Sequence, residues 1–166
     1  MDNSSKVVII TLNFNQNDYT IACVNSLLKS NYTNFEILLI DNGSSSSSFS
    51  SLLDVNFNDD RLIIERIEKN IGYVGGINYG LKMAKDLFAD YFIIMNNDTI
   101  ICENAITEFL NSSKRNKDNA IITGKVYHYD EPNILQDIGQ YCRDSKKLDY
   151  PPVIPSYYEE DIGQYN

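Results

Sequence analysis

Short apolar stretches alternate with longer stretches of helical spacing along the first three quarters of the chain. The short stretches are rich in β-branched residues, which is typical of buried strands. They predict strands over Val7–Leu12, Glu36–Ile40, Arg61–Ile67, Tyr91–Met95 and Ala120–Val126. Between them, apolar residues recur every three or four positions, as on the buried face of a helix. Three helices are expected, around Ile21, Val24, Leu27 and Leu28, around Ile77, Leu81, Ala84 and Phe88, and around Ile106, Phe109 and Leu110.

Polar and small residues indicate where the helices begin. Asn17 or Asp18 is expected to cap the first helix, because such side chains accept hydrogen bonds from free backbone N–H groups. The serine run Ser44–Ser48 is expected to be a surface loop rather than a linker, with a weak helix after it around Leu52. The pair Gly75–Gly76 is expected to precede the second of the three helices.

The alternation of strand and helix predicts an α/β fold class. We expect a Rossmann-like, doubly wound and mostly parallel sheet with helices on both faces. Right-handed crossovers place the carboxyl ends of parallel strands at one edge, where such sheets bind their ligands. The polar residues that follow the predicted strands are therefore the candidates for chemistry: Thr11, Asn13, Asp41, Asn96, Asn97 and Asp98.

The last part of the chain has a different character. Seven of the twelve tyrosines lie from Tyr127 onward, and prolines interrupt the segment at four positions. This composition predicts a hairpin and a long loop rather than further strand–helix units. We expect an α/β domain over residues 1–129, with the role of binding a ligand, and the incomplete hairpin and loop start of a second region over residues 130–166. A doubly wound domain that stops in a loop is expected to be truncated at its C-terminal side.

Composition and charge exclude several classes of function. The chain has 14 Lys and Arg against 23 Asp and Glu, which gives a net charge of −9. Such a chain is expected to repel nucleic acids and to find little attraction at an anionic membrane surface. Three widely spaced cysteines, a single histidine, and the absence of a signal peptide or an apolar span long enough for a bilayer indicate a cytoplasmic protein without a zinc site.

Asn96-Asn97-Asp98 follows a predicted strand and offers only oxygen ligands. Mg²⁺ is usually held by one or two carboxylates together with substrate phosphates. Asp98 is a candidate carboxylate ligand and Asn96 a candidate carbonyl ligand for Mg²⁺ or Mn²⁺. The alternative is an ordinary polar turn.

Two further stretches could contact a nucleotide. Asp41 follows the second predicted strand, where an acidic residue can accept hydrogen bonds from a ribose, although Asp41-Asn42-Gly43 is also a favourable turn sequence. The glycine-rich stretch Asn70–Gly80 could bring backbone N–H groups close to an anion. It lacks the dinucleotide-binding spacing, and Leu81 stands where a Walker A loop needs Lys. A glycine-rich helix start without a ligand is the alternative.

Taken together and in order, these stretches resemble glycosyltransferase family 2, and in particular its rhamnosyltransferase-like branch. The resemblance covers about Lys6–Tyr129. It implies a GT-A type fold, a nucleoside-diphosphate-sugar donor, a divalent cation and an inverting transfer. The Thr-Tyr-Asn element of the family matches Thr11–Asn13, with Leu12 in place of the aromatic residue. Its Asp-Asn-Gly-Ser element, which contacts the base and the ribose, matches Asp41–Ser44.

The resemblance also assigns the remaining positions. Its Asn-x-Gly-Phe-Ala-Gly-Gly-Asn element matches Asn70–Gly80, with Tyr73, Val74 and Ile77 as departures, and Asn96-Asn97-Asp98 matches its Asp-x-Asp motif. It implies that Asp98 is the main metal ligand and that the missing first carboxylate weakens metal affinity. The residues expected to bind the nucleotide sugar are Thr11, Asn13, Asp41, Asn42, Gly43, Asn70, Gly72, Gly76, Asn78, Asn96 and Asn97, and those expected to bind the metal are Asp98 and Asn96.

The catalytic base of the family is expected beyond Asn166. The acceptor is expected to be a saccharide or a lipid-linked molecule used in polysaccharide biosynthesis, with the longer protein at the inner face of the membrane. Two other functions stay open from the sequence: a non-catalytic module that binds nucleotide sugars, and a nucleotidyltransferase. The lack of a basic glycine-rich loop after the first predicted strand disfavours the nucleotidyltransferase.

Overall fold

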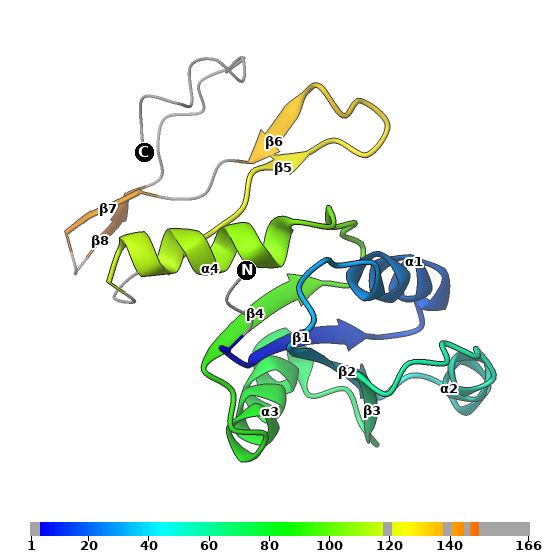
Figure 1. Cartoon of the computed structure of the whole chain (residues 1–166). Helices are drawn as coiled ribbons and strands as arrows, with labels where there is room; N and C mark the ends of the chain where they lie inside the picture. The colour runs from blue at the N-terminus through cyan, green and yellow to red at the C-terminus, as the bar shows by residue number, and fades with distance from the viewer. Residues whose placement is uncertain (1–3, 118–120, 138–140, 145–146, 150–166) are drawn as a thin grey trace. The chain divides into compact units, whose positions relative to one another are not determined.

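The computed structural model describes residues 4–117, 121–137, 141–144 and 147–149 and separates into two units, Met1–Glu108 and Phe109–Asn166. The first unit contains one parallel sheet with the strand order β3-β2-β1-β4 (Figure 1). Its strands are β1 (Val7–Asn13), β2 (Phe35–Asn42), β3 (Leu62–Ile67) and β4 (Tyr91–Asn96). Its helices are α1 (Asn17–Leu28), α2 (Ser46–Leu53) and α3 (Gly72–Asp86), and α4 (Ala105–Arg115) begins near its end.

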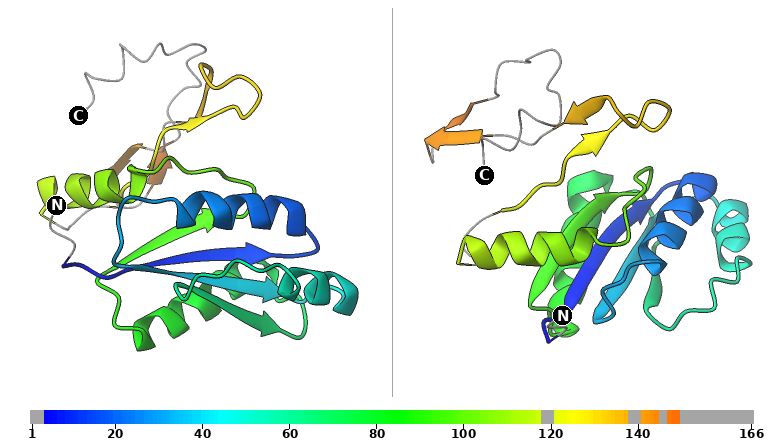
Figure 2. Two further views of the ribbon diagram at one scale, coloured as in Figure 1. Left: turned by 45° about the vertical axis from the view of Figure 1, so that its right-hand side comes forward. Right: turned by 45° about the horizontal axis from the view of Figure 1, so that its top comes forward.

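The two central strands are buried on both faces, as their continuous apolar sequences predict. Val7–Ile10 of β1 and Ile37–Ile40 of β2 are fully buried. Strand β4 lies at the edge of the sheet and alternates between half-buried and exposed side chains. Figure 2 shows α1 and α3 on opposite faces of the sheet, so the predicted doubly wound α/β fold is confirmed.

Helix α3 packs closely against one face of the sheet. Ile77 and Ala84 contact a cluster of Val8, Ile10, Leu38 and Ile40. The glycines of α3 allow this approach: a Cβ atom on Gly80 would lie 2.6 Å from Cγ2 of Ile10, and one on Gly76 would lie 2.8 Å from Cδ1 of Leu12.

The position of these glycines corrects one prediction. The pair Gly75–Gly76 was expected to precede the helix, but α3 begins three residues earlier, at Gly72. Gly76 therefore lies inside the helix, with Leu12 and Asn42 as the nearest side chains.

The predicted cap of α1 is wrong. The N-cap of α1 is Gln16 and no side chain caps it; Asn17 instead donates from Nδ2 to the backbone carbonyl of Ser48 at 2.7 Å. The helix expected around Leu52 is confirmed as α2, but the serine run is not a continuous loop, because the Ser45 hydroxyl accepts from the N–H of Ser48 and α2 begins at Ser46. Good capping by serine explains why a serine-rich segment can open a helix.

The second unit contains short strands. Strand β5 (Val126–Tyr127) pairs antiparallel with β6 (Leu135–Asp137), and β7 (Tyr141–Asp144) pairs antiparallel with β8 (Lys147–Asp149). The expected hairpin is thus confirmed, whereas the expected long tail falls largely in residues 150–166, outside the described residues.

The predicted fifth strand over Ala120–Val126 is wrong over residues 121–125, which have no regular structure, whereas Val126 does lie in β5. Ala120 lies outside the described residues. The side chain of Ile121 is 97% exposed, and Gly124 disfavours strand formation in this run. In the part of the chain that the structure describes, no helix is both long enough and apolar enough to cross a membrane.

Candidate functional site

A cavity of about 390 Å³ opens at the carboxyl edge of the sheet in the first unit. Residues from the ends of β1, β2 and β4 and from the start of α3 line it. Six of the lining side chains are carboxamides, one is a carboxylate, and two are aromatic. The lining residues are Leu12, Asn13, Phe14, Gln16, Asn42, Asn70, Gly72, Tyr73, Asn96, Asn97 and Asp98.

A buried polar network supports the floor of this cavity. Asn13 and Asp41 are register partners at the ends of β1 and β2, and both are fully buried. Asn13 Nδ2 donates to Asp41 Oδ1 at 3.0 Å, and the N–H of Ser44 donates to Asp41 Oδ2 at 3.2 Å. The Nε of Arg66 lies 3.9 Å from the same Oδ2. Asp41 therefore holds Asn13 in place from behind the cavity wall.

A second group of contacts fixes the start of α3. Asn42 Nδ2 donates to Asn70 Oδ1 at 3.3 Å and to the backbone carbonyl of Gly72 at 3.1 Å. In return, Asn42 Oδ1 accepts from the N–H of Ile71 at 3.2 Å. These bonds join the end of β2 to the first turn of α3, so that Gly72 and Tyr73 face the cavity.

The oxygen atoms at the end of β4 fit a hard divalent cation. Asp98 is exposed and lines the cavity, as does Asn96, whose Oδ1 accepts from the Tyr73 hydroxyl at 3.3 Å. Among the described residues, no group of three or more His, Cys, Asp or Glu could hold a metal by itself. One carboxylate and one carbonyl suit an ion such as Mg²⁺ that takes its other ligands from water and substrate phosphates.

The structure brings most of the predicted site residues together but places five elsewhere. Asn13, Asn42, Asn70, Gly72, Asn96, Asn97 and Asp98 all line the cavity. Thr11 and Asp41 are fully buried, Gly76 faces Leu12, and Asn78 is exposed but does not line the cavity. Gly43 packs against the backbone of Lys69 and Asn70.

Sequence reasoning missed the two aromatic side chains and Gln16. Phe14 and Tyr73 line the cavity and are about half exposed. The sequence did contain a signal for Phe14. The family's Thr-Tyr-Asn element has an aromatic residue between a polar residue and Asn, and Asn13-Phe14-Asn15 has this order, two residues after Thr11. Because β1 continues to Asn13, the residues that leave the strand and reach the cavity are Phe14 and Gln16.

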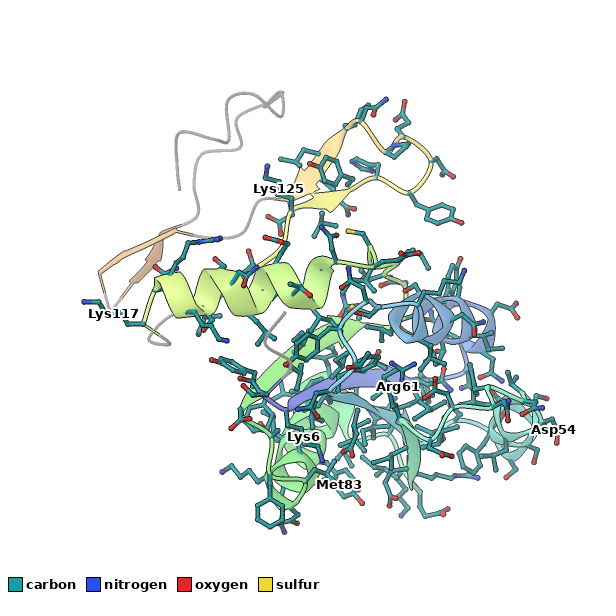
Figure 3. All side chains as sticks on the ribbon, viewed as in Figure 1. Lys6, Asp54, Arg61, Met83, Lys117 and Lys125 are labelled. Atoms are coloured by element: carbon teal, nitrogen blue, oxygen red, sulfur yellow. The ribbon has the colours of Figure 1, made fainter. Side chains whose placement is uncertain are left out.

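The cavity has no positive side chain of its own. None of the described residues that line it is Lys, Arg or His. Lys6 and Arg61, labelled in Figure 3, directly precede β1 and β3. They therefore lie at the amino ends of these strands, whereas the cavity lies at the carboxyl edge of the sheet. Lys6 pairs with Glu36 at 3.0 Å, and Arg61 with Asp59 at 2.6 Å.

A buried thiol lies behind the loop that carries Asp98. The Cys23 S–H donates to the backbone carbonyl of Asn96 at 3.7 Å. Burial raises the pKa of the Cys23 thiol to about 12, and the negative charge of Asp98 also raises it. Because only the thiolate is nucleophilic, Cys23 is inert at neutral pH.

We expect iodoacetamide at pH 8 to modify the exposed Cys102 and to leave Cys23 unmodified in the folded chain. Peptide mass spectrometry distinguishes the two positions, and the same reaction in guanidinium should modify both. Modification of Cys23 at the rate of Cys102 in the folded chain would contradict the buried position.

Solved structures share this fold. A crystal structure of a TarS fragment from S. aureus aligns with a TM-score of 0.58 at 19% identity, over 72% of this chain and 38% of the other. A mannosyltransferase from Pyrobaculum calidifontis, solved with GDP-Man and Mn²⁺, aligns with a TM-score of 0.57 at 14% identity, over 68% of this chain and 34% of the other. The first unit thus has the parallel-sheet fold of GT-A glycosyltransferases.

Sequence comparison then gives the family. Residues 7–160 match the family model described as glycosyl transferase family 2, so the chain belongs to that family. The glycosyltransferase GlyG of Streptococcus pneumoniae is 31% identical over 128 residues, which make up 77% of this chain and 41% of GlyG. Poly-beta-1,6-N-acetyl-D-glucosamine synthase of Staphylococcus aureus is 22% identical over 83% of this chain and 32% of its own length. The chain spans less than half the length of these relatives.

Proposed function

We propose that this chain supplies the donor site of a metal-dependent, inverting glycosyltransferase. In this proposal a nucleoside diphosphate carries the sugar, and a saccharide or a lipid-linked molecule of the cell envelope receives it. The observation that carries the proposal is the cavity, which combines two aromatic side chains, six carboxamides and the Asp98 carboxylate. Related folds support it, since TarS structures exist in complex with UDP and with UDP-GlcNAc.

The aromatic and amide side chains suit the nucleoside. Phe14 offers an apolar ring on which a base can stack, with the ring of Tyr73 on the same cavity. Carboxamides both donate and accept hydrogen bonds, so Asn13, Asn42 and Asn70 can bind base edges and ribose hydroxyls without adding charge.

The other residues expected to bind the donor take two roles in this proposal. Gly72, Asn96 and Asn97 line the cavity and contact the donor. Thr11, Asp41, Gly43 and Gly76 act from behind the wall, by packing or by hydrogen bonding to lining residues. Asn78, which is exposed away from the lining set, has the weakest support.

Asp98 and Asn96 are the residues that would hold Mg²⁺ or Mn²⁺. When bound, the cation stabilises the negative charge that develops on the nucleoside diphosphate as the sugar leaves. Inversion further requires a base that removes the proton of the acceptor hydroxyl. We assign no described residue to that task, and the family resemblance puts it beyond Asn166.

Three narrower points belong to the same proposal. The Asn96-Asn97-Asp98 sequence supports the rhamnosyltransferase-like branch and a hexosyl or rhamnosyl donor. The synthase among the relatives supports a role in polysaccharide biosynthesis. The widely spaced cysteines support a cytoplasmic site. A lipid-linked acceptor would place the longer protein at the inner face of the membrane.

UDP is expected to bind weakly in the presence of a chelator and at least about tenfold more tightly with Mn²⁺, a difference of about 1.4 kcal/mol. The reason is that no cationic side chain lines the described cavity, while Asp98 adds a negative charge to it. Isothermal titration calorimetry measures both affinities.

Uridine is the control ligand for this experiment. It has no phosphate, so its affinity should be almost the same with and without Mn²⁺. Equal affinities for UDP in chelator and in Mn²⁺ would contradict metal-dependent donor binding. Binding without any sugar transfer by the longer protein would instead favour a non-catalytic binding module.

A further inference from the structure

A chain of hydrogen bonds crosses the ends of β2, β1 and β4, which are neighbours in the sheet. Asn13 Nδ2 donates to Asp41 Oδ1 at 3.0 Å, which joins β2 to β1. The Thr20 hydroxyl donates to Asn13 Oδ1 at 2.9 Å, and Asn97 Nδ2 donates to Thr20 Oγ1 at 2.9 Å. Thr20 therefore bridges the end of β1 and the turn that follows β4.

Thr20 occupies a position where an apolar side chain would be expected. It is fully buried on the face of α1 that also carries Cys23, Val24 and Leu27. A buried hydroxyl is unfavourable unless it is hydrogen-bonded. Here its partners are Asn13, Asn97 and the backbone carbonyl of Gln16 at 3.0 Å, and all three residues line the cavity.

The turn held by Thr20 is the one that carries Asp98. Asn97 and Asp98 lie just past the end of β4, where the strand no longer fixes the backbone. Helix α1 contacts this turn at two points, because one turn after Thr20 the Cys23 S–H donates to the carbonyl of Asn96. Two side chains of α1 therefore hold the residues that directly precede Asp98 in the turn.

We propose that Thr20 is a positioning residue for the cation-binding turn. Its hydroxyl holds Asn97, and with it Asp98, in place before the donor arrives, and links that turn to the Asn13–Asp41 pair under the nucleoside. A turn ordered in advance loses less conformational freedom on binding. This inference rests on the proposed function, since it assumes that Asp98 holds a divalent cation in the presence of a nucleoside diphosphate.

The test compares Thr20→Val, which keeps the shape but removes the hydroxyl, with Thr20→Ser, which keeps the hydroxyl. Mn²⁺ binding in the presence of UDP is measured by electron paramagnetic resonance of free Mn²⁺. Loss of a residue that supports a metal ligand typically lowers metal affinity about 10- to 100-fold. We expect a loss in that range for Thr20→Val and near wild-type affinity for Thr20→Ser.

Thr107→Val is the matched control. Thr107 also uses its hydroxyl in a side-chain hydrogen bond, to Asn31 Oδ1 at 3.2 Å, but it does not line the cavity. This variant should bind Mn²⁺ and UDP as the wild type does. The far-UV circular-dichroism spectrum of Thr20→Val should equal that of the wild type, whereas a general loosening of the fold would change it.

Thr20→Ala removes the same hydroxyl with a smaller side chain and keeps the test decisive if Thr20→Val does not fold. Wild-type Mn²⁺ affinity in Thr20→Val or in Thr20→Ala would overturn the positioning role, as would a Thr20→Ser variant as weak as Thr20→Val. A wild-type chain that binds no UDP at any Mn²⁺ concentration would overturn the proposed function itself, and the role of Thr20 with it.

Discussion

Replacing Gly43 with alanine should destabilise the first unit by about 2–5 kcal/mol. Gly43 has a φ of +80°, a conformation that costs an L-residue roughly 1–2 kcal/mol. A Cβ atom there would also collide with the backbone of Lys69 and Asn70, and overpacking typically costs about 1–3 kcal/mol. Backbone cannot move aside as a flexible side chain can, so both contributions apply. Urea unfolding followed by circular dichroism measures the change.

Gly72→Ala separates the two contributions. Gly72 has nearly the same backbone conformation, with a φ of +78°, but a Cβ atom there would have no neighbour within 4 Å. This variant should lose only the conformational part, about 1–2 kcal/mol. If Gly43→Ala and Gly72→Ala lost the same free energy of unfolding, the result would contradict the close contact of Gly43 with the backbone of Lys69 and Asn70.

The strands and the fold class could be predicted because local sequence determines them. Val7–Ile10 and Ile37–Ile40 are continuous apolar runs with many β-branched residues, and a parallel sheet buries such runs on both faces. The run that begins at Ile121 was also expected to be a strand, but residues 121–125 pair with no strand in the described part of the chain. Composition alone cannot tell these cases apart, because strand formation depends on a partner that lies elsewhere in the sequence.

The candidate site could be predicted where position after a strand was sufficient. Asn13, Asn96, Asn97 and Asp98 follow β1 or end β4, so the topology brings them to one edge. Phe14 was missed because β1 extends one residue further than its apolar run. The first residue after the strand is therefore Phe14 rather than Asn13.

Two roles depend on contacts that a sequence does not reveal. Gly76 and Gly80 have the spacing of one helix face, but only the structure shows that this face packs on Leu12 and Ile10 rather than on a phosphate. Thr20 contacts Asn97 across 77 positions of sequence, and no local pattern distinguishes it from another buried hydroxyl residue of α1, Ser26.

Replacing Asp98 with alanine should weaken Mn²⁺-dependent UDP binding by at least about tenfold, or about 1.4 kcal/mol, and should leave the fold intact. Asp98 is the only carboxylate among the described residues that line the cavity, and it is exposed, so its removal leaves no cavity in the core.

Asp54→Ala is the matched control, because Asp54, labelled in Figure 3, is also exposed but ends α2 away from the lining residues. Removing either residue changes the net charge equally, so an effect of net charge alone would change UDP binding similarly in both variants. A loss confined to Asp98→Ala, measured by calorimetry at matched Mn²⁺ concentrations, would support a direct metal ligand. Wild-type affinity in Asp98→Ala would remove Asp98 from the site, and an altered circular-dichroism spectrum would show that its role is structural instead.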